Sequence, residues 1–232
     1  MSALYDIFCR SSGVTTDSRT ISEGSLFFAL RGASFDGNRF AIDALHKGAS
    51  VAVVDDATVI ENAPEELAER LFLVENTLTA LQDLAREHRE VLAIPILSVA
   101  GSNGKTTTKE LVARVLAEKY EVYATRGNLN NHIGVPLTLL AMDQTTEFGV
   151  VEMGASACGE IALLASIAKP NYGILTNIGR SHLEGFGGVE GIRRGKGELF
   201  DYLNATGGRA FVPADDEVLS AMAAERENMA VE

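Results

Sequence analysis

Apolar residues in this chain fall into short uninterrupted runs, separated by longer segments in which they recur every three or four positions. The short runs predict buried strands, and the spaced segments predict amphipathic helices. The predicted strands span 26–30, 51–54, 71–74, 96–100, 121–124, 148–152, 172–176 and 209–212. The predicted helices span 39–48, 77–91, 107–119, 134–141, 159–168 and 189–203.

This alternation predicts an α/β protein, because strands that alternate with helices usually form parallel sheets covered by those helices. Ile94-Pro95 ends the helix at 77–91 and begins a second series of elements, so we expect a domain boundary near 88–94. We therefore predict a small α/β domain over residues 1–88 and a larger, mostly parallel-sheet domain over residues 89–232.

The last predicted strand is followed by a charged, helix-prone tail, residues 215–232, which shows no terminal cap. A sheet begun in this way normally continues. We therefore expect the larger domain to be incomplete and the chain to be a fragment of a longer protein.

Composition narrows the class of protein. Of the 232 residues, 46% are hydrophobic and 22% are charged, which is typical of a soluble globular protein. The net charge of −12 argues against non-specific binding to nucleic acid. We find no apolar run long enough for a membrane span and no signal peptide. Cys9 and Cys158 have neither a metal-site nor a disulfide spacing, so we expect a cytoplasmic protein.

The most informative segment is the glycine-rich loop at residues 101–107, between a predicted strand and a predicted helix. Such a loop lets backbone N–H groups approach phosphate oxygens at the positive end of the helix. Its lysine can reach the outer phosphates and its first threonine can ligate Mg²⁺. The usual pattern would place a glycine at Val99, so this is a variant loop. The candidate phosphate-binding residues are Gly101, Ser102, Asn103, Gly104, Lys105, Thr106 and Thr107.

Further polar residues follow other predicted strands. Glu152 ends the strand at 148–152 and is a candidate Mg²⁺ ligand, or alternatively a solvated acid. Asn177 and His182 come after the next strand. Because the carboxyl ends of parallel strands meet at one edge of a sheet, we expect these residues beside the phosphate loop. A lone histidine is more often structural than a ligand, but this placement favours a functional one.

Two other features are ambiguous from the residues alone. Lys196 lies in a predicted helix, and its position favours a solvated lysine. The polar run 127–134 contains Asn128, Asn130 and Asn131, whose amides could bind a ligand or cap a helix with about equal weight.

Taken together, these motifs resemble the Mur ligases of peptidoglycan synthesis, and the resemblance covers nearly the whole chain. The run Asn-Leu-Asn-Asn followed by Ile-Gly-Val-Pro is similar to the branch that adds D-Ala-D-Ala. The similar segments are 16–19, 26–32, 36–37, 101–107, 127–131, 133–138, 151–155, 176–177, 182–185 and 196–198.

The resemblance implies a defined reaction. ATP phosphorylates the terminal carboxylate of UDP-N-acetylmuramoyl-tripeptide and leaves as ADP, the amine of D-Ala-D-Ala attacks the acyl phosphate, and a tetrahedral intermediate collapses to an amide and phosphate. The resemblance also implies two Mg²⁺ sites, a UDP-sugar-binding first domain and a central ATP-binding second domain. We expect a monomer.

The resemblance assigns a role to each candidate residue. It implies that Lys105 holds the β- and γ-phosphates, that Lys196 is carbamylated, and that Lys105, Lys196 and His182 serve catalysis. A carbamate converts a cationic amine into an anion that can bind metal. The implied metal ligands are Thr106, Glu152, His182 and carbamylated Lys196. The implied substrate-binding residues are Asp17, Ser18, Arg19, Asp36, Gly37, Asn128 and Asn131.

Two departures from the family pattern stand out. Asn38 occupies a position where the family commonly has histidine. The chain also lacks the family's adenine-side residues and C-terminal domain, so we expect it not to complete the ligation. The alternatives are a ligase like folylpolyglutamate synthetase, which shares the ATPase core, and a non-catalytic UDP-sugar-binding module.

Overall fold

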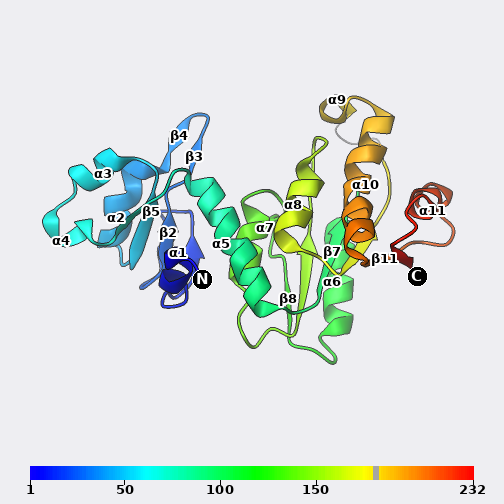
Figure 1. Ribbon diagram of the computed structural model, residues 1–232, viewed down its shortest axis with the longest axis horizontal. Helices are drawn as coiled ribbons and strands as arrows, with labels where there is room; N and C mark the ends of the chain where they lie inside the picture. The colour runs from blue at the N-terminus through cyan, green and yellow to red at the C-terminus, as the bar shows by residue number, and fades with distance from the viewer. Residues whose placement is uncertain (180–182) are drawn as a thin grey trace. The chain divides into compact units, whose positions relative to one another are not determined.

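The computed structural model describes residues 1–179 and 183–232, and the chain forms two compact units, Met1–His88 and Arg89–Glu232 (Figure 1). Both units combine helices with parallel sheets, which confirms the predicted α/β class. In the first unit the elements are α1 (Ala3–Phe8), β1 (Val14–Thr15), β2 (Leu26–Phe28), β3 (Arg31–Gly32), β4 (Phe35–Asp36), the 3₁₀ helix η1 (Gly37–Phe40), α2 (Ala41–His46), β5 (Val51–Val54), α3 (Ala57–Glu61), α4 (Glu65–Ala68), β6 (Leu71–Leu73) and α5 (Thr77–Leu92), whose last turn continues into the second unit.

The sheet of the first unit has the strand order β1-β2-β5-β6, and its neighbouring strands are parallel. Its core packs apolar side chains of β2 and β5 against those of α2, with Phe27, Leu45 and Val54 among the buried residues. Burying a side chain of this size contributes about 1.5–3 kcal/mol relative to leaving it exposed.

The helix α5 is capped at its N-terminus by Asn76, whose Oδ1 accepts a hydrogen bond from the Thr79 N–H at 2.9 Å. The Thr77 hydroxyl donates to the Ala29 carbonyl, at 3.1 Å. Thr77 therefore ties α5 to the end of β2, a tertiary contact that has no local sequence signal.

We expect Gly37→Ala to destabilise the first unit by about 1–3 kcal/mol, the usual range for forcing atoms into a packed site. A Cβ at this position would lie 2.5 Å from the Leu30 carbonyl oxygen and 2.7 Å from the Ala29 carbonyl carbon, and backbone atoms cannot move aside cheaply. Gly32→Ala is the matched control, because its added Cβ would make only an ordinary contact. Urea unfolding of both variants measures the difference; equal midpoints would contradict the prediction.

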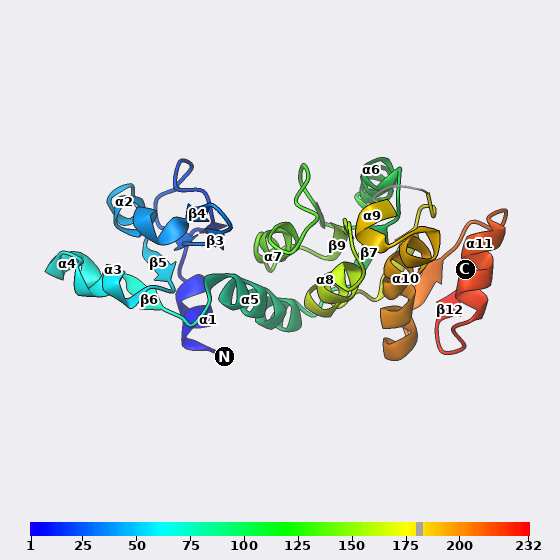
Figure 2. The same cartoon turned by 90° about the horizontal axis from the view of Figure 1, so that it is seen from above.

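The second unit contains β7 (Ile96–Ala100), α6 (Lys105–Leu116), β8 (Val122–Ala124), α7 (Gly134–Leu140), β9 (Phe148–Glu152), α8 (Glu160–Ala168), β10 (Tyr172–Leu175), α9 (Leu183–Phe186), α10 (Val189–Thr206), β11 (Arg209–Phe211), α11 (Glu217–Ala224) and β12 (Ala230–Val231). The sheet has the order β12-β11-β10-β7-β9-β8, with parallel neighbours throughout the described strands. Figure 2 shows α6 on one face of this sheet and α8 and α10 on the other.

Strand register brings three carboxyl ends to the same edge of this sheet. Val99 of β7 pairs with Glu152 of β9, and Ala100 pairs with Leu175 of β10. The loop after β7, the acid that ends β9 and the residues that follow β10 therefore lie together, as the strand pattern predicts.

Two predictions about element bounds in this unit are wrong. The helix α6 begins at Lys105 rather than at residue 107, because Gly104 takes a left-handed conformation (φ +78°) from which the helix can start directly. The charged tail is not helical throughout, because α11 is followed by the strand β12. Asp216 caps α11 by accepting hydrogen bonds from the N–H groups of Val218 and Leu219, and β12 then pairs with β11.

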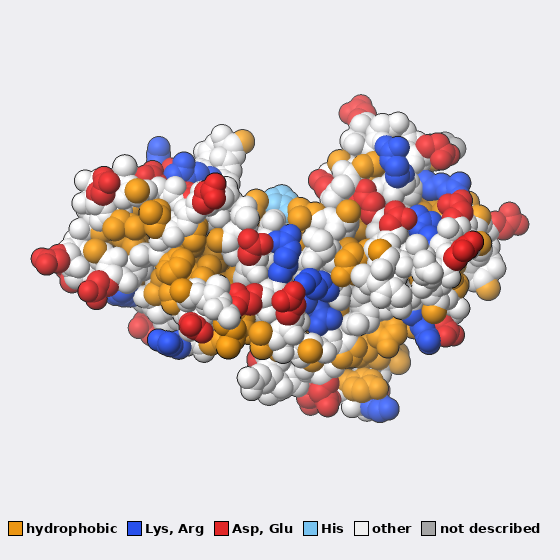
Figure 3. All heavy atoms as spheres, in the orientation of Figure 1, with side chains coloured by type: hydrophobic (Ala, Val, Ile, Leu, Met, Phe, Trp, Pro, Cys, Tyr) orange, Lys and Arg blue, Asp and Glu red, His pale blue; other side chains and the backbone are white. Residues whose placement is uncertain are grey.

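On the face drawn in Figure 3, acidic and basic side chains are interspersed among apolar ones, so the net charge is spread over this face rather than gathered in one patch. Among the described residues, no helix is long and apolar enough to cross a bilayer.

Candidate active site

The phosphate loop, residues 101–107, leaves the buried strand β7 and enters α6. Gly101 has φ +133°, a conformation that favours glycine, and an added Cβ would lie 2.1 Å from the Thr176 hydroxyl oxygen. The displaced glycine of this variant loop is thus explained: the end of β10 passes too close to residue 101 for a side chain.

The Lys105 side chain folds back over this loop. Its Nζ donates hydrogen bonds to the carbonyl oxygens of Gly101 and Ser102, at 3.0 and 3.2 Å. Both acceptors are neutral, and no carboxylate lies within ion-pairing distance of Lys105 among the described residues. Because a phosphate oxygen carries negative charge and a carbonyl oxygen does not, the Lys105 ammonium can exchange these carbonyls for a phosphate.

Residues after β10 brace the loop from one side. The Thr176 hydroxyl donates to the Asn103 carbonyl at 2.6 Å, and the Asn177 Oδ1 accepts the Asn103 N–H at 3.0 Å. The Ser102 N–H donates to the Asn177 carbonyl at 3.1 Å. Asn177, which the strand pattern placed at this edge, therefore fixes the loop's shape.

Glu152 is buried, with 2% of its surface exposed, which excludes the solvated acid considered from the sequence. Its N–H donates to the Thr125 hydroxyl at 3.0 Å. Thr125 is in turn held by Lys109, whose Nζ donates to the Thr125 carbonyl at 2.6 Å and pairs with Glu110 at 2.7 Å. Sequence reasoning missed Lys109 and Thr125, since a lysine one turn inside a helix ordinarily lies in solvent.

The three asparagines of the run 127–134 have different roles. Asn130 donates its amide hydrogen to Glu152 Oε1 at 2.8 Å. Asn131 caps α7, accepting hydrogen bonds from the N–H groups of Ile133 and Gly134 at 3.1 and 2.9 Å. Asn128 is exposed. The sequence thus pointed to the correct run, but the predicted pair Asn128 and Asn131 left out the residue that contacts Glu152.

Lys196 of α10 is 1% exposed, so the solvated lysine favoured by its sequence position is wrong. Its Nζ donates to the Ala155 carbonyl at 2.8 Å and lies 5.0 Å from the centre of the Phe186 ring. Burial, together with the nearby charge of Lys105, lowers the pKa of Lys196 to about 8, against the opposing attraction of Glu160 and Glu198. A substantial fraction of this amine is therefore neutral near physiological pH.

A cavity of about 600 Å³ joins these features within the second unit. Lys105 and Lys196 both line it, as do Ser102 and Asn131. Thr106 and Thr107 are exposed on the first turn of α6, and His182 lies outside the described residues. In the part of the chain that the structure describes, no three His, Cys, Asp or Glu side chains gather as a metal cluster.

The predicted substrate-side residues of the first unit fall in two places. Asp17 and Arg19 form an exposed two-point ion pair, and the Ser18 carbonyl accepts a hydrogen bond from Lys47. Asp36 lines a cavity of about 320 Å³ together with Arg31 and Arg39.

Asn38, the departure from the family pattern, is buried beside this cavity. Its side-chain amide donates to Asp36 at 2.9 Å and to Asp55 at 2.8 Å, while its Oδ1 accepts the Asp55 N–H. Asn38 therefore holds two carboxylates in place.

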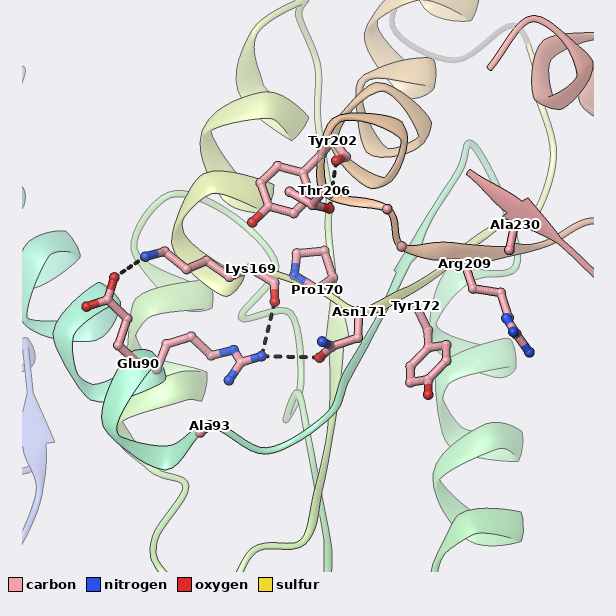
Figure 4. A pocket seen from close by; sticks show the side chains of 13 residues that line it. Glu90, Ala93, Lys169, Pro170, Asn171, Tyr172, Tyr202, Thr206, Arg209 and Ala230 are labelled. Carbon is pink, nitrogen blue, oxygen red and sulfur yellow. Dashed lines mark hydrogen bonds and ion pairs between the residues drawn. The ribbon is translucent and has the colours of Figure 1, made fainter. Parts of the chain in front are cut away.

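A second cavity of about 620 Å³ lies at the opposite edge of the second unit's sheet, where β10 and β11 begin (Figure 4). The Arg89 guanidinium donates there to the carbonyls of Ala168 and Lys169 at the end of α8, and to Asn171. Lys169 pairs with Glu90, and Arg209 pairs with Glu232. Because these cations are already engaged, we interpret this cavity as a structural junction.

The parallel sheet, the phosphate loop and the acid that ends β9 together define a nucleotide-binding α/β protein of the P-loop type. Sequence comparison specifies it further. Residues 99–232 match the family model described as "Mur ligase middle domain", and residues 10–89 match "Mur ligase family, catalytic domain". The chain belongs to the Mur ligase family, which confirms the resemblance inferred from its motifs.

Two individual ligases match most of the chain. The chain is 45% identical over 195 residues to the UDP-N-acetylmuramoyl-tripeptide–D-alanyl-D-alanine ligase of Bacillus subtilis, covering 84% of this chain and 42% of that protein. The enzyme of the same name from Synechocystis is 48% identical over 190 residues, covering 82% and 41%.

Solved structures show the same relationship. The crystal structure of MurF from Acinetobacter baumannii superposes with a TM-score of 0.82 at 34% identity, covering 94% of this chain and 47% of that one. The MurF ligase of Thermotoga maritima in complex with ADP gives 0.82 at 34% identity, covering 97% and 50%. The chain therefore spans between two fifths and one half of the length of these relatives.

Proposed function

We propose that this chain carries the UDP-sugar-binding and ATP-binding parts of a ligase that adds D-Ala-D-Ala to UDP-N-acetylmuramoyl-tripeptide in peptidoglycan synthesis. The observation that carries the proposal is that Lys105 of the phosphate loop and the buried Lys196 line the same cavity. The names of relatives 45% and 48% identical to the chain supply the two substrates, the UDP-linked tripeptide and the D-alanyl-D-alanine dipeptide. The match over residues 10–89 favours this function over a folylpolyglutamate synthetase-like ligase.

In this reaction the chain's own groups position and neutralise phosphate. Lys105 leaves its two carbonyl acceptors and binds the β- and γ-phosphates, while the N–H groups at the start of α6 face the same anion. Such positioned charge is the main contribution that proteins make to phosphoryl transfer. The tripeptide carboxylate attacks the γ-phosphate and releases ADP. The amine of D-Ala-D-Ala then attacks the resulting acyl phosphate, and the intermediate loses phosphate and a proton to give the amide.

The residues present fit the Mg²⁺ that the family implies. Glu152 has one carboxylate oxygen, Oε2, that is buried without a hydrogen-bond partner among the described residues. Such an oxygen is costly unless a cation or donor meets it. We propose that Thr106 and Glu152 ligate one Mg²⁺, that His182 ligates a second, and that carbamylated Lys196 is a further metal ligand. Mg²⁺ there would neutralise charge that develops on the phosphates.

For the UDP end of the substrate we propose the first unit. The cavity beside Asp36 is lined by two arginines, Arg31 and Arg39, whose charge suits a diphosphate. Gly37, with no room for a side chain, keeps the backbone close behind Asp36. Asp17, Ser18 and Arg19 are the other candidate UDP contacts, while Asn128 and Asn131 are candidates for the nucleotide or peptide edge.

Calorimetry with the purified chain tests this function. We expect Mg²⁺–ATP and UDP-N-acetylmuramoyl-tripeptide each to bind. Binding of the UDP substrate with no ATP binding would instead favour the non-catalytic module. Phosphate release with all three substrates is expected to be far slower than in the full-length Bacillus subtilis relative, because the chain matches 42% of that protein.

We further propose that the protein acts as a cytoplasmic monomer. Both of its cysteines are free thiols, which suits a reducing compartment. Analytical ultracentrifugation tests the oligomeric state, and a stable dimer at micromolar concentration would contradict it.

A further inference from the structure

Glu152 is held by two hydrogen bonds, one to its backbone and one to its carboxylate, and its second carboxylate oxygen is left unpaired among the described residues. Its backbone N–H is bonded to the Thr125 hydroxyl at 3.0 Å, and its Oε1 accepts from the Asn130 amide at 2.8 Å. Its Oε2 has no partner within the described part of the chain, although it is buried. Asn130 thus occupies one oxygen of the carboxylate and leaves the other available.

The Asn130 side chain is itself confined. The Gly154 N–H donates to the Asn130 carbonyl at 2.7 Å, which ties the loop at 130 to the turn that follows β9. A Cβ on Gly154 would lie only 2.9 Å from Asn130 Oδ1. The amide is therefore packed against the backbone of the turn, and its Nδ2 is a fixed donor rather than a mobile surface group.

We propose that Asn130 is a positioning residue that orients Glu152 for the divalent cation of the bound nucleotide. This inference rests on the proposed function, in which Glu152 is a metal ligand. An amide N–H donor cannot bind a cation, so it holds Oε1 and leaves Oε2 as the oxygen that meets the metal. Loss of an outer partner of this kind typically weakens metal affinity by about 10- to 100-fold.

The same arrangement explains why an asparagine is required. Aspartate at residue 130 would present an oxygen to Oε1 and repel it, whereas alanine would leave the carboxylate free to rotate. Asn130→Asp keeps the size of the side chain, so it tests the hydrogen bond with little change in packing. Asn130→Ala tests the same bond by removal.

The experiment measures Mn²⁺ binding to the purified chain by electron paramagnetic resonance, with ADP present, and therefore does not depend on turnover. Both Asn130 variants are expected to bind Mn²⁺ about 10- to 100-fold more weakly than the parent chain. The affinity of Asn130→Ala for ADP in EDTA should be unchanged, because Asn130 makes no hydrogen bond to the phosphate loop among the described residues and alanine adds no charge to the cavity.

Asn171→Ala is the matched control. Asn171 is a structural asparagine of the same unit, bonded to Arg89 and to the Ile96 N–H at the opposite edge of the sheet. Its loss should lower the melting temperature without changing Mn²⁺ affinity. If both Asn130 variants bind Mn²⁺ within twofold of the parent chain, the positioning role is overturned. If the parent chain binds no Mn²⁺ with ADP, the metal site of the proposed function is overturned as well.

Discussion

Lys105→Ala is expected to weaken binding of Mg²⁺–ATP by about 10- to 150-fold. The lysine ammonium is the charged donor of the phosphate loop, and hydrogen bonds to charged groups contribute about 1.5–3 kcal/mol, where each 1.4 kcal/mol is tenfold in affinity. In the ligand-free chain Lys105 bonds only the carbonyls of Gly101 and Ser102 among the described residues. The variant therefore loses little stability, and its melting temperature should stay close to that of the parent chain.

Isothermal titration calorimetry with a non-hydrolysable ATP analogue measures this effect. Lys119→Ala is the matched control, because Lys119 lies beyond the end of α6, where it packs over the Tyr120 ring. Equal affinities in the Lys105 variant and the control would mean that the loop does not bind phosphate through its lysine. The proposed function would then lose its main support.

Strands could be predicted from the sequence where burial alone determines the pattern of apolar residues. The strands at 51–54, 96–100 and 148–152 have the predicted bounds, because central strands of a parallel sheet are buried on both faces and appear as continuous apolar runs. The two-residue strands β1 and β12 could not be predicted, since two residues show no periodicity. They form because a neighbouring strand offers unpaired backbone groups.

The site was predictable in its local part only. The phosphate loop lies within seven consecutive residues, so its glycines and lysine could be identified directly. The burial of Lys196 depends on how α10 packs against Ala155 and Phe186, which are distant in sequence. The choice among Asn128, Asn130 and Asn131 likewise depends on which of them faces β9, and the spacing of adjacent residues in a loop does not fix that.

The environment of Lys196 also determines how readily it can be modified. Only a neutral amine attacks CO₂, and a lysine is neutral above its pKa. The pKa of Lys196 is lowered from 10.5 to about 8. At pH 7 its neutral fraction is therefore roughly a few hundred times that of an ordinary lysine. Among the lysines of the chain, the carbamate should therefore form first at Lys196, and more fully as the pH rises through 8.

We accordingly expect a carbamate carbon signal in the ¹³C NMR spectrum of the chain equilibrated with ¹³C-labelled bicarbonate. It should be absent in Lys196→Ala and retained in Lys169→Ala, whose lysine is paired with Glu90. Depleting CO₂ should weaken Mg²⁺-dependent nucleotide binding in the parent chain, and added bicarbonate should restore it. A signal that persists in Lys196→Ala would assign the carbamate elsewhere. If metal-dependent nucleotide binding is insensitive both to bicarbonate and to Lys196→Ala, Lys196 is not a metal ligand. Glu152 would then hold the cation without it.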